Sequence, residues 1–261
     1  LEGVTFSAQD GQLVGIIGHT GSGKSTLVQH LNGLLKPKSG SIVVGGTDIT
    51  SDGVVMRDIR KKIGLVFQYP EYQLFEETVA KDVAFGPVNL GLSEAEIDEC
   101  VKEAIEMVGL DYEKVKNVSP FELSGGQKRR AAIAGVIAMK PEVLILDEPT
   151  AGLNPKAHAD ILNMVETIHR KSKNIIFLVS HNMNDIARMS DKVLVMNHGR
   201  LVMDGTPAEV FSREEELKSM GLALPDSMEI MMRLKKAGMD INTDCLTMDE
   251  AAEEIAKVLA K

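Results

Sequence analysis

A glycine-rich segment near the start of the chain has residue types suited to holding phosphate. Residues 18–25 read Gly-His-Thr-Gly-Ser-Gly-Lys-Ser, which is the spacing of a phosphate-binding loop. The glycines let the backbone wrap closely around a polyphosphate, so that successive N–H groups point at its oxygens. Lys24 is expected to neutralise the β- and γ-phosphates, and Ser25 to hold Mg²⁺. The segment therefore predicts binding of a nucleoside triphosphate, with contacts from Gly18, His19, Thr20, Gly21, Ser22, Gly23, Lys24, Ser25 and Thr26.

Two neighbouring acids end an apolar run in the middle of the chain. The run 143–146 is followed directly by Asp147 and Glu148. A buried parallel strand delivers its carboxyl end to the crevice in which ligands of α/β sheets bind. We expect Asp147 to be a Mg²⁺ partner and Glu148 to polarise the water that attacks the γ-phosphate. The two acids therefore predict that the bound nucleoside triphosphate is also hydrolysed.

The sequence Leu-Ser-Gly-Gly-Gln at residues 123–127, called the LSGGQ motif below, predicts a second anion site. Ser124 can cap the helix that continues to Met139, and the two glycines expose its N-terminal amides. Because a long helical insertion separates this motif from the phosphate loop, one phosphate is not expected to reach both in one subunit. The motif therefore predicts two subunits that sandwich the nucleotide. The expected contacts are Ser124, Gly125, Gly126 and Gln127.

The elements that must position these motifs alternate between strands and helices, which favours an α/β architecture with a largely parallel sheet. A helix is expected at 24–35, and the pattern from about 78 to 138 is helical, with Ser93 and Glu96 as a capping box. Strands are expected at 13–17, 42–44, 63–67, 143–146, 175–179, 193–196 and 201–203.

The tail after about residue 225 is expected to form two amphipathic helices. The second begins with Thr247 and Glu250 as a capping box. The sequence leaves open whether this tail helps two subunits to dimerise or covers the core. The residues expected to be buried by the second helix are Ala251, Ile255, Val258 and Leu259.

Composition and charge exclude several classes of protein. The 261 residues include 29 basic and 38 acidic side chains, a formal charge of −9, which argues against a chain-wide electrostatic grip on nucleic acid. No apolar run approaches the roughly 18 residues that span a bilayer. Cys100 and Cys245 lack metal-ligand spacing and fit a reducing cytosol better than a secreted disulfide scaffold. Because the first residue is Leu1 rather than Met, we expect the natural start to be missing.

The motifs, in their order along the chain, resemble the nucleotide-binding subunit of ABC transporters over roughly residues 1–220. The resemblance rests on the phosphate loop, Gln68, the LSGGQ motif, the strand ending in Asp147 and Glu148, and His181. It implies an α/β fold with a P-loop NTPase core of ABC ATPase type. It also implies ATP and Mg²⁺ as cofactors.

The same resemblance assigns roles to residues that chemistry alone leaves undecided. Gln68 would lie at the junction with a helical subdomain, where it would bind Mg²⁺ and sense the membrane partner. His181 would contact the γ-phosphate and hold the attacking water with Glu148. The expected domains are a cassette at 1–220, with the helical subdomain inserted at about 70–140, and a short helical C-terminal extension at 221–261.

Residues 66–78 and 81–87 are more particular, and closely resemble the ATPase subunits of energy-coupling factor transporters, which import vitamins and metal ions such as cobalt or nickel. Residues 119–126, 238–239 and 246–249 resemble the second of the two paralogous ATPases in those complexes. The resemblance implies a second ATPase subunit, with a paralogous heterodimer favoured over a homodimer. It also implies a membrane-embedded coupling subunit and a substrate-binding membrane component. The chain would then lie at the cytoplasmic face of a bacterial cell membrane, without binding nucleic acid.

Aromatic residues gather just after Gln68, in a chain with only 4% aromatic residues. They could form a groove for helices of the coupling subunit. For Phe75 and Phe85, the alternative is the small core of the helical insertion, and the sequence leaves both open. The group consists of Tyr69, Tyr72, Leu74, Phe75 and Phe85.

The chain departs from the family pattern at two places. Asn154 stands where the loop after the catalytic acid usually ends in aspartate, although Asn154 before Pro155 is still a good helix start. One negative charge at the expected dimer interface is therefore lost. The aromatic residue on which the family stacks adenine would lie upstream of Leu1, and Phe6, in a strand-like segment, is expected to be core.

Two other functions compete with transport. A soluble ABC-type ATPase acting on nucleic acid or ribosomes is one, but the interval between Ser25 and Leu123 leaves no room for long coiled coils, and only one cassette is present. A nucleotide-binding scaffold without turnover is the other, and the presence of both Asp147 and Glu148 disfavours it.

Overall fold

The computed structural model describes residues 1–260, which form two compact units. The outer unit, named for its origin at the two ends of the chain, consists of Leu1–Lys24 and Leu178–Lys261, and the central unit consists of Ser25–Phe177. Each unit combines helices with a parallel pair of strands, so the predicted α/β class is confirmed. The predicted cassette and C-terminal extension stay predictions, because a division by compactness does not test them.

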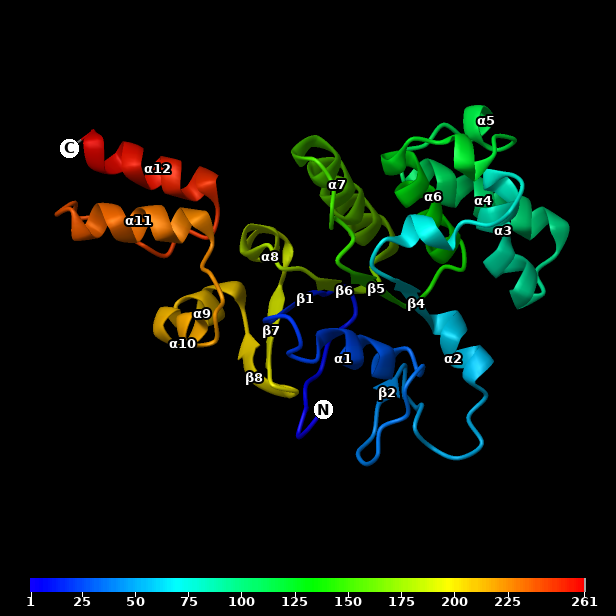
Figure 1. Ribbon diagram of the computed structural model, residues 1–261, viewed down its shortest axis with the longest axis horizontal. Helices are drawn as coiled ribbons and strands as arrows, with labels where there is room; N and C mark the ends of the chain where they lie inside the picture. The colour runs from blue at the N-terminus through cyan, green and yellow to red at the C-terminus, as the bar shows by residue number, and fades with distance from the viewer. Residues whose placement is uncertain (261) are drawn as a thin grey trace. The chain divides into compact units, whose positions relative to one another are not determined.

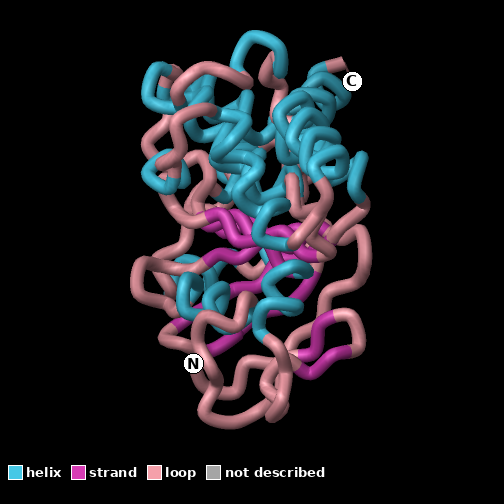
Figure 2. The backbone as a smooth tube through the Cα atoms, turned by 90° about the vertical axis from the view of Figure 1, so that its right-hand side faces the viewer, coloured by secondary structure: helices cyan, strands magenta, loops and turns pink. Residues whose placement is uncertain are grey.

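The strands of the central unit are short and mostly buried. Strands β4 and β5 run parallel, with Ile63 opposite Val143 and Val66 opposite Leu146. Every residue of both strands is buried, as continuous apolar runs predict. The hairpin β2–β3 is a separate antiparallel pair, drawn in magenta in Figure 2. The strands are β2 (Val43–Val44), β3 (Thr47–Asp48), β4 (Ile63–Val66), β5 (Val143–Asp147) and the first part of β6 (Ile175–Val179).

The helices of the central unit confirm the helical pattern predicted from about 78 to 138. Helices α3, α4 and α6 pack against one another, and Figure 1 shows them gathered beside α5. The capping box of Ser93 and Glu96 is present at the start of α4. The helices are α1 (Lys24–Leu31), α2 (Met56–Lys62), α3 (Val79–Leu90), α4 (Glu94–Met107), α5 (Tyr112–Val115), α6 (Gly125–Ile137) and α7 (Pro155–Ser172), with 3₁₀ turns η1 (Pro70–Gln73) and η2 (Pro120–Glu122).

Helix α1 ends earlier than its apolar spacing predicts. It stops at Leu31 rather than at residue 35, because Gly33 adopts a left-handed conformation with φ of 69°. The N–H of Leu34 then bonds back to the carbonyl of Gln29 (2.9 Å), which closes the helix end in the manner of a glycine C-cap.

The outer unit is built on strand β1 and its parallel neighbour β7. Val14 lies opposite Lys192 and Ile17 opposite Val195, and β7 continues into the antiparallel β8. A side chain at Gly15 would meet Ser190 Oγ at 2.6 Å, so glycine lets α8 lie directly on β1. The elements are β1 (Leu13–Ile17), α8 (Met183–Met189), β7 (Lys192–Asn197), β8 (Arg200–Gly205), α9 (Pro207–Phe211), α10 (Glu214–Ser219), α11 (Asp226–Lys236) and α12 (Met248–Leu259).

The predicted two-helix tail is present, and α11 and α12 lie side by side (Figure 1). The capping box of Thr247 and Glu250 is confirmed. Ala251 is buried, and Ile255 and Val258 pack on a small core around it. The predicted burial of Leu259 is wrong, since this side chain is 73% exposed at the last residue of α12. It stands about 100° around the helix from Val258, outside the stripe that faces α11.

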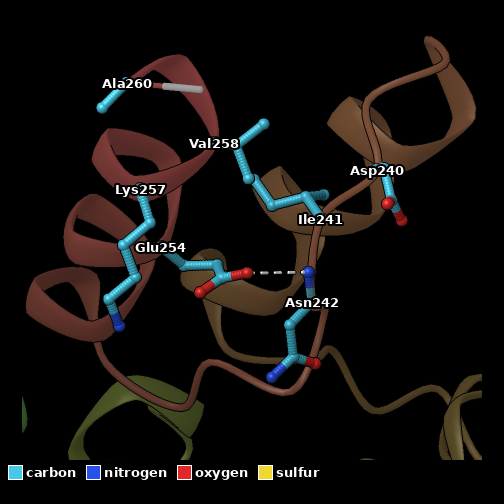
Figure 3. A pocket seen from close by; sticks show the side chains of 7 residues that line it. All are labelled: Asp240, Ile241, Asn242, Glu254, Lys257, Val258 and Ala260. Carbon is cyan, nitrogen blue, oxygen red and sulfur yellow. Dashed lines mark hydrogen bonds between the residues drawn. The ribbon is translucent and has the colours of Figure 1, made fainter.

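A pocket opens between α12 and the segment that follows α11 (Figure 3). The backbone N–H of Asn242 donates to the Glu254 carboxylate (3.3 Å) across it. Among residues 1–260, no helix is both long enough and apolar enough to cross a membrane.

The predicted strand at the start of the chain is wrong. No regular element precedes Leu13, and Phe6 is half-buried rather than fully buried. The backbone N–H of Glu2 bonds to Gly199, and the Lys192 ammonium donates to the carbonyl of Ser7 (2.8 Å).

Candidate active site

The phosphate loop lies in the outer unit, between β1 and the start of α1. A side chain at Gly18, where φ is 154°, would meet the carbonyl oxygen of Met196 at 2.3 Å, so only glycine fits this cradle. The buried Lys24 curls back over the loop, and its ammonium donates to the carbonyls of Gly18 (2.7 Å) and His19 (3.1 Å). A backbone cradle with a cation at its rim fits a polyphosphate.

The ring of His19 is held at the side of the loop by the turn between β7 and β8. Its Nε2 lies 3.0 Å from Asn197 Oδ1, and its Nδ1 lies 2.7 Å from the carbonyl of Thr20. The ring also packs against His198, with centroids 4.9 Å apart. The backbone of residue 19 stays in the loop, while the imidazole is engaged by its neighbours.

His181 lies in the same unit as the loop, in the turn between β6 and α8. The turn is fixed by its neighbours: the N–H of Asn182 donates to Ser180 Oγ (3.0 Å), and the N–H of Ser180 donates to the Ile16 carbonyl at the end of β1. His181 is exposed and directly follows Ser180, whose backbone is bonded to β1, the strand that leads into the phosphate loop. The expected contact of His181 with the γ-phosphate stays a prediction.

Gln68 and Glu148 meet in the central unit. The amide of Gln68 donates to the Glu148 carboxylate (2.8 Å). The strand register explains this contact. Val66 lies opposite Leu146, and Gln68 and Glu148 each come two residues after these paired residues. Glu148 has a left-handed φ of 50°, which marks a sharp turn directly after the strand.

Asp147 is the last residue of β5 and is buried. It immediately precedes Glu148, so both acids lie at the end of β5, which pairs with β4, the strand that leads to Gln68. Hydroxyl, amide and carboxylate oxygens, such as those of Ser25, Gln68 and Asp147, are the donors that Mg²⁺ prefers. Among residues 1–260, no cluster of three or more His, Cys, Asp or Glu side chains could hold a metal. The donor set therefore fits Mg²⁺ completed by phosphate oxygens and water, not an all-protein metal cage.

The LSGGQ motif begins α6, as predicted. Ser124 and Gln127 form a capping box, in which the Ser124 N–H donates to Gln127 Oε1 (3.0 Å) and the Gln127 N–H donates to Ser124 Oγ (3.4 Å). A side chain added at Gly125 or Gly126 would meet nothing within 4 Å. The start of α6 is therefore open, which suits contact with an anion from another molecule.

The sequence reading missed Arg129, on the turn of α6 that follows the LSGGQ motif. Its guanidinium is only 2% exposed and binds both carboxylate oxygens of Glu71, at 2.9 and 2.7 Å. It also donates to the carbonyls of Pro149 (3.1 Å) and Ala151 (2.8 Å). A basic residue on the otherwise apolar face of α6 is the one sequence signal that could have pointed to it.

The Glu71–Arg129 ion pair predicts a pH-dependent loss of stability. Partial burial disfavours ionisation of Glu71, but the hydrogen bonds from Arg129, a backbone hydrogen bond and the charge of Arg129 together outweigh it and hold the pKa of this carboxyl below its ordinary value of 4.5. The stabilisation is therefore complete above pH 4.5 and is lost as the pH falls through the lowered pKa. Glu71→Gln is expected to cost about 3 kcal/mol at pH 7, because Arg129 stays buried without its counter-charge. Urea unfolding should show this difference shrinking in acid, and an equal difference at pH 7 and pH 3 would contradict the assignment.

The aromatic group after Gln68 is on the surface. Tyr72, Phe75 and Phe85 are 84%, 58% and 51% exposed, and the two phenylalanines pack edge to face with centroids 5.1 Å apart. Leu74, the other member of the group, is buried. The core alternative for Phe75 and Phe85 is thus wrong, because the residues that α3 buries are Val79, Val83 and Pro87 instead.

Comparison with known proteins places these features in one family. Residues 1–151 match the family model described as ABC transporter. An energy-coupling factor transporter ATP-binding protein EcfA2 from Caldanaerobacter subterraneus subsp. tengcongensis is 59% identical over 259 residues, covering 99% of this chain and 90% of the relative. The protein of the same name from Clostridioides difficile is 56% identical over 260 residues, with the same coverage of both chains.

Solved structures show the same fold. The cbiO1 protein of Clostridium perfringens, described as part of the ABC transporter complex cbiONQ, matches with a TM-score of 0.76 and 38% identity, covering 91% of this chain and 90% of that one. The ATP-binding cassette MJ0796, described as a dimer in a post-hydrolysis state bound to ADP and Pi, matches with a TM-score of 0.68 and 27% identity, covering 78% of this chain and 89% of that one.

Proposed function

Since the chain belongs to the ABC transporter family, and within it to the ATP-binding proteins of energy-coupling factor transporters, we propose that its ATP hydrolysis powers the uptake of a vitamin or a transition-metal ion such as cobalt or nickel. The observation that carries the catalytic part is the 2.8 Å hydrogen bond between Gln68 and Glu148 at the ends of two paired strands. It sets a carboxylate and a polar amide beside the acid expected to bind Mg²⁺.

The chain's residues divide the work of hydrolysis. The backbone N–H groups of the phosphate loop and the Lys24 ammonium hold the β- and γ-phosphates, and Ser25, Gln68 and Asp147 would hold Mg²⁺. When bound there, Mg²⁺ would supply positive charge that offsets the negative charge of the phosphates. Glu148 orients the attacking water and takes up its proton. His181 donates to the γ-phosphate and helps to fix that water.

The LSGGQ motif contacts the nucleotide of a second ATPase subunit. The support is the open start of α6, where Ser124 is exposed and no side chain covers Gly125 or Gly126. One subunit then supplies the phosphate loop and Glu148, and the other supplies the helix start. The resemblance of the tail to one of two paralogous ATPases favours a heterodimer.

The membrane partner binds the aromatic patch formed by Tyr72, Phe75 and Phe85. The support is that all three rings are exposed and that Phe75 and Phe85 pack against each other, since exposed aromatic residues are characteristic of interaction sites. Helices of a membrane-embedded coupling subunit fit them. A separate substrate-binding membrane component selects the imported molecule. The chain is accordingly peripheral, at the cytoplasmic face of a bacterial cell membrane.

Co-purification and turnover test this function together. A tagged copy of the chain is isolated from detergent-solubilised membranes of cells that make the full complex, and ATP hydrolysis is measured in the isolated material. We expect a second ATPase and integral membrane proteins to accompany the chain, and turnover to require Mg²⁺. Recovery of nucleic acid or ribosomes in place of membrane proteins would instead support the soluble-ATPase alternative.

Asn154 gives a prediction about communication between the two ATP sites. Its side chain caps α7 by accepting from the Ala157 N–H (3.0 Å), and aspartate would keep this cap while adding a negative charge. Asn154→Asp is therefore expected to leave folding and ATP hydrolysis intact but to change the cooperativity of the dimer, by up to about twofold in Hill coefficient. Steady-state kinetics against ATP concentration measure it. If neither turnover nor cooperativity changes, Asn154 has no such role.

A further inference from the structure

Arg129 is the most completely engaged polar side chain near the catalytic residues. Its side chain is 2% exposed, and four of its five N–H donors have acceptors: two on the Glu71 carboxylate and one each on the carbonyls of Pro149 and Ala151. A buried guanidinium costs several kcal/mol unless its donors are satisfied. We call Arg129 with its partners Glu71, Pro149 and Ala151 the Arg129 joint. It is rigid because any movement of the partners leaves a buried donor unpaired.

The joint ties together three segments that each carry part of the site. Arg129 itself lies on α6, one turn after the LSGGQ motif. Glu71 lies in η1, three residues after Gln68. Pro149 and Ala151 lie in the turn that follows Glu148.

Tyr69 reinforces the same joint. Its backbone is left-handed (φ 56°), and its ring lies 5.8 Å from the Arg129 guanidinium carbon. A side chain at Gly152 would come within 3.5 Å of the Tyr69 ring, so the ring also packs on the turn after Glu148. The contacts of Arg129 and Tyr69 thus connect the segment that carries Gln68 to the segment that carries Glu148. They do so independently of the direct hydrogen bond between these two side chains.

We propose that Arg129 is a positioning residue for ATP hydrolysis, which holds the Gln68 and Glu148 side chains in register through its bonds to Glu71 and to the carbonyls of Pro149 and Ala151. The inference rests on the proposed function, and extends it to a residue outside the contacts proposed for the nucleotide and the attacking water. Lysine cannot replace it, because one ammonium cannot bind a carboxylate in bidentate fashion and reach two carbonyls on the other side.

The test uses Arg129→Lys in the assembled complex. We expect kcat to fall between about 10- and 100-fold, the range expected for a misplacement of about 1 Å, while the KM for ATP changes less than about twofold. Arg130→Lys is the matched control on the same helix. Arg130 bonds to the carbonyl of Val108 and pairs with Asp160, away from the joint, so its variant should keep kcat.

Two further measurements separate positioning from a general loss of structure. In Arg129→Ala, guanidinium ion added to the solution should restore part of the lost kcat, because it can occupy the vacated space and bind the same acceptors. In a double-mutant cycle with Gln68→Ala, the Arg129→Lys effect on kcat should largely disappear, since both act on the same pair. Additive effects in that cycle, or an unchanged kcat in Arg129→Lys, would overturn the inference.

The outcomes also separate this inference from the proposed function. A wild-type complex that hydrolyses no ATP, or that lacks membrane partners, would remove the proposed function. A wild-type complex with normal turnover that is matched by Arg129→Lys would remove only the role of Arg129.

Discussion

Replacing Glu148 by glutamine is expected to stop ATP hydrolysis and leave nucleotide binding intact. The amide keeps an oxygen that can accept from Gln68 at the 2.8 Å contact, so the turn is not disturbed. What it loses is the ability to take a proton from the attacking water, and loss of a general base costs about 10²- to 10⁴-fold in rate. Turnover by the purified complex measures this directly.

The same variant should accumulate the closed state of the dimer. If hydrolysis reopens the two-subunit sandwich, ATP-bound Glu148→Gln subunits stay associated, which size-exclusion chromatography with ATP and Mg²⁺ detects. Glu142→Gln is the matched control, because Glu142 lies directly before β5, whereas Glu148 lies directly after it, and Glu142 forms an ion pair with Lys62 on the surface. Normal turnover in Glu148→Gln would remove Glu148 from its assigned role.

Replacing Lys24 by alanine is expected to abolish useful nucleotide binding. Its ammonium is buried against the carbonyls of Gly18 and His19, at the rim of the cradle that β- and γ-phosphates would enter. Charge-assisted hydrogen bonds contribute about 1.5–3 kcal/mol each, so losing contacts to two phosphate oxygens corresponds to a drop in affinity of about 10²-fold or more. Calorimetric titration with ATP and Mg²⁺ measures it.

A control is needed because Lys24 also stabilises the loop itself through its bonds to Gly18 and His19. Lys38→Ala removes an equal charge from an exposed position after α1, and should leave the affinity for ATP unchanged. Thermal melting of both variants then separates a local loss of binding from unfolding. Retained ATP affinity in folded Lys24→Ala would contradict the assignment of the loop.

The features that the sequence by itself determined are those set by neighbours in the chain. The glycine cradle, the capping boxes at Ser93, Ser124 and Thr247, and the buried strand before Asp147 all follow from rules that act over about four residues. Sterics and local hydrogen bonds decide such features wherever the segment lies in the fold.

Tertiary structure alone decided which distant residues meet. Gln68 touches Glu148 because β4 and β5 pair in a particular register, and a shift of one residue would point these side chains elsewhere. Glu71 and Arg129 are 58 residues apart, and neither position carries a motif that announces the pair.

The tertiary structure also settled what each apolar or aromatic side chain covers. Phe75 and Phe85 are residue types expected in a core, but they lie on the surface. Leu259 comes directly after the partly buried Val258 of its helix, but its side chain is exposed. Burial depends on what packs against a face, and periodicity gives only the face. The residue types of the site therefore follow from local sequence. The relative positions of Gln68 and Glu148 follow from the register of β4 and β5 and, as proposed, from the buried Arg129.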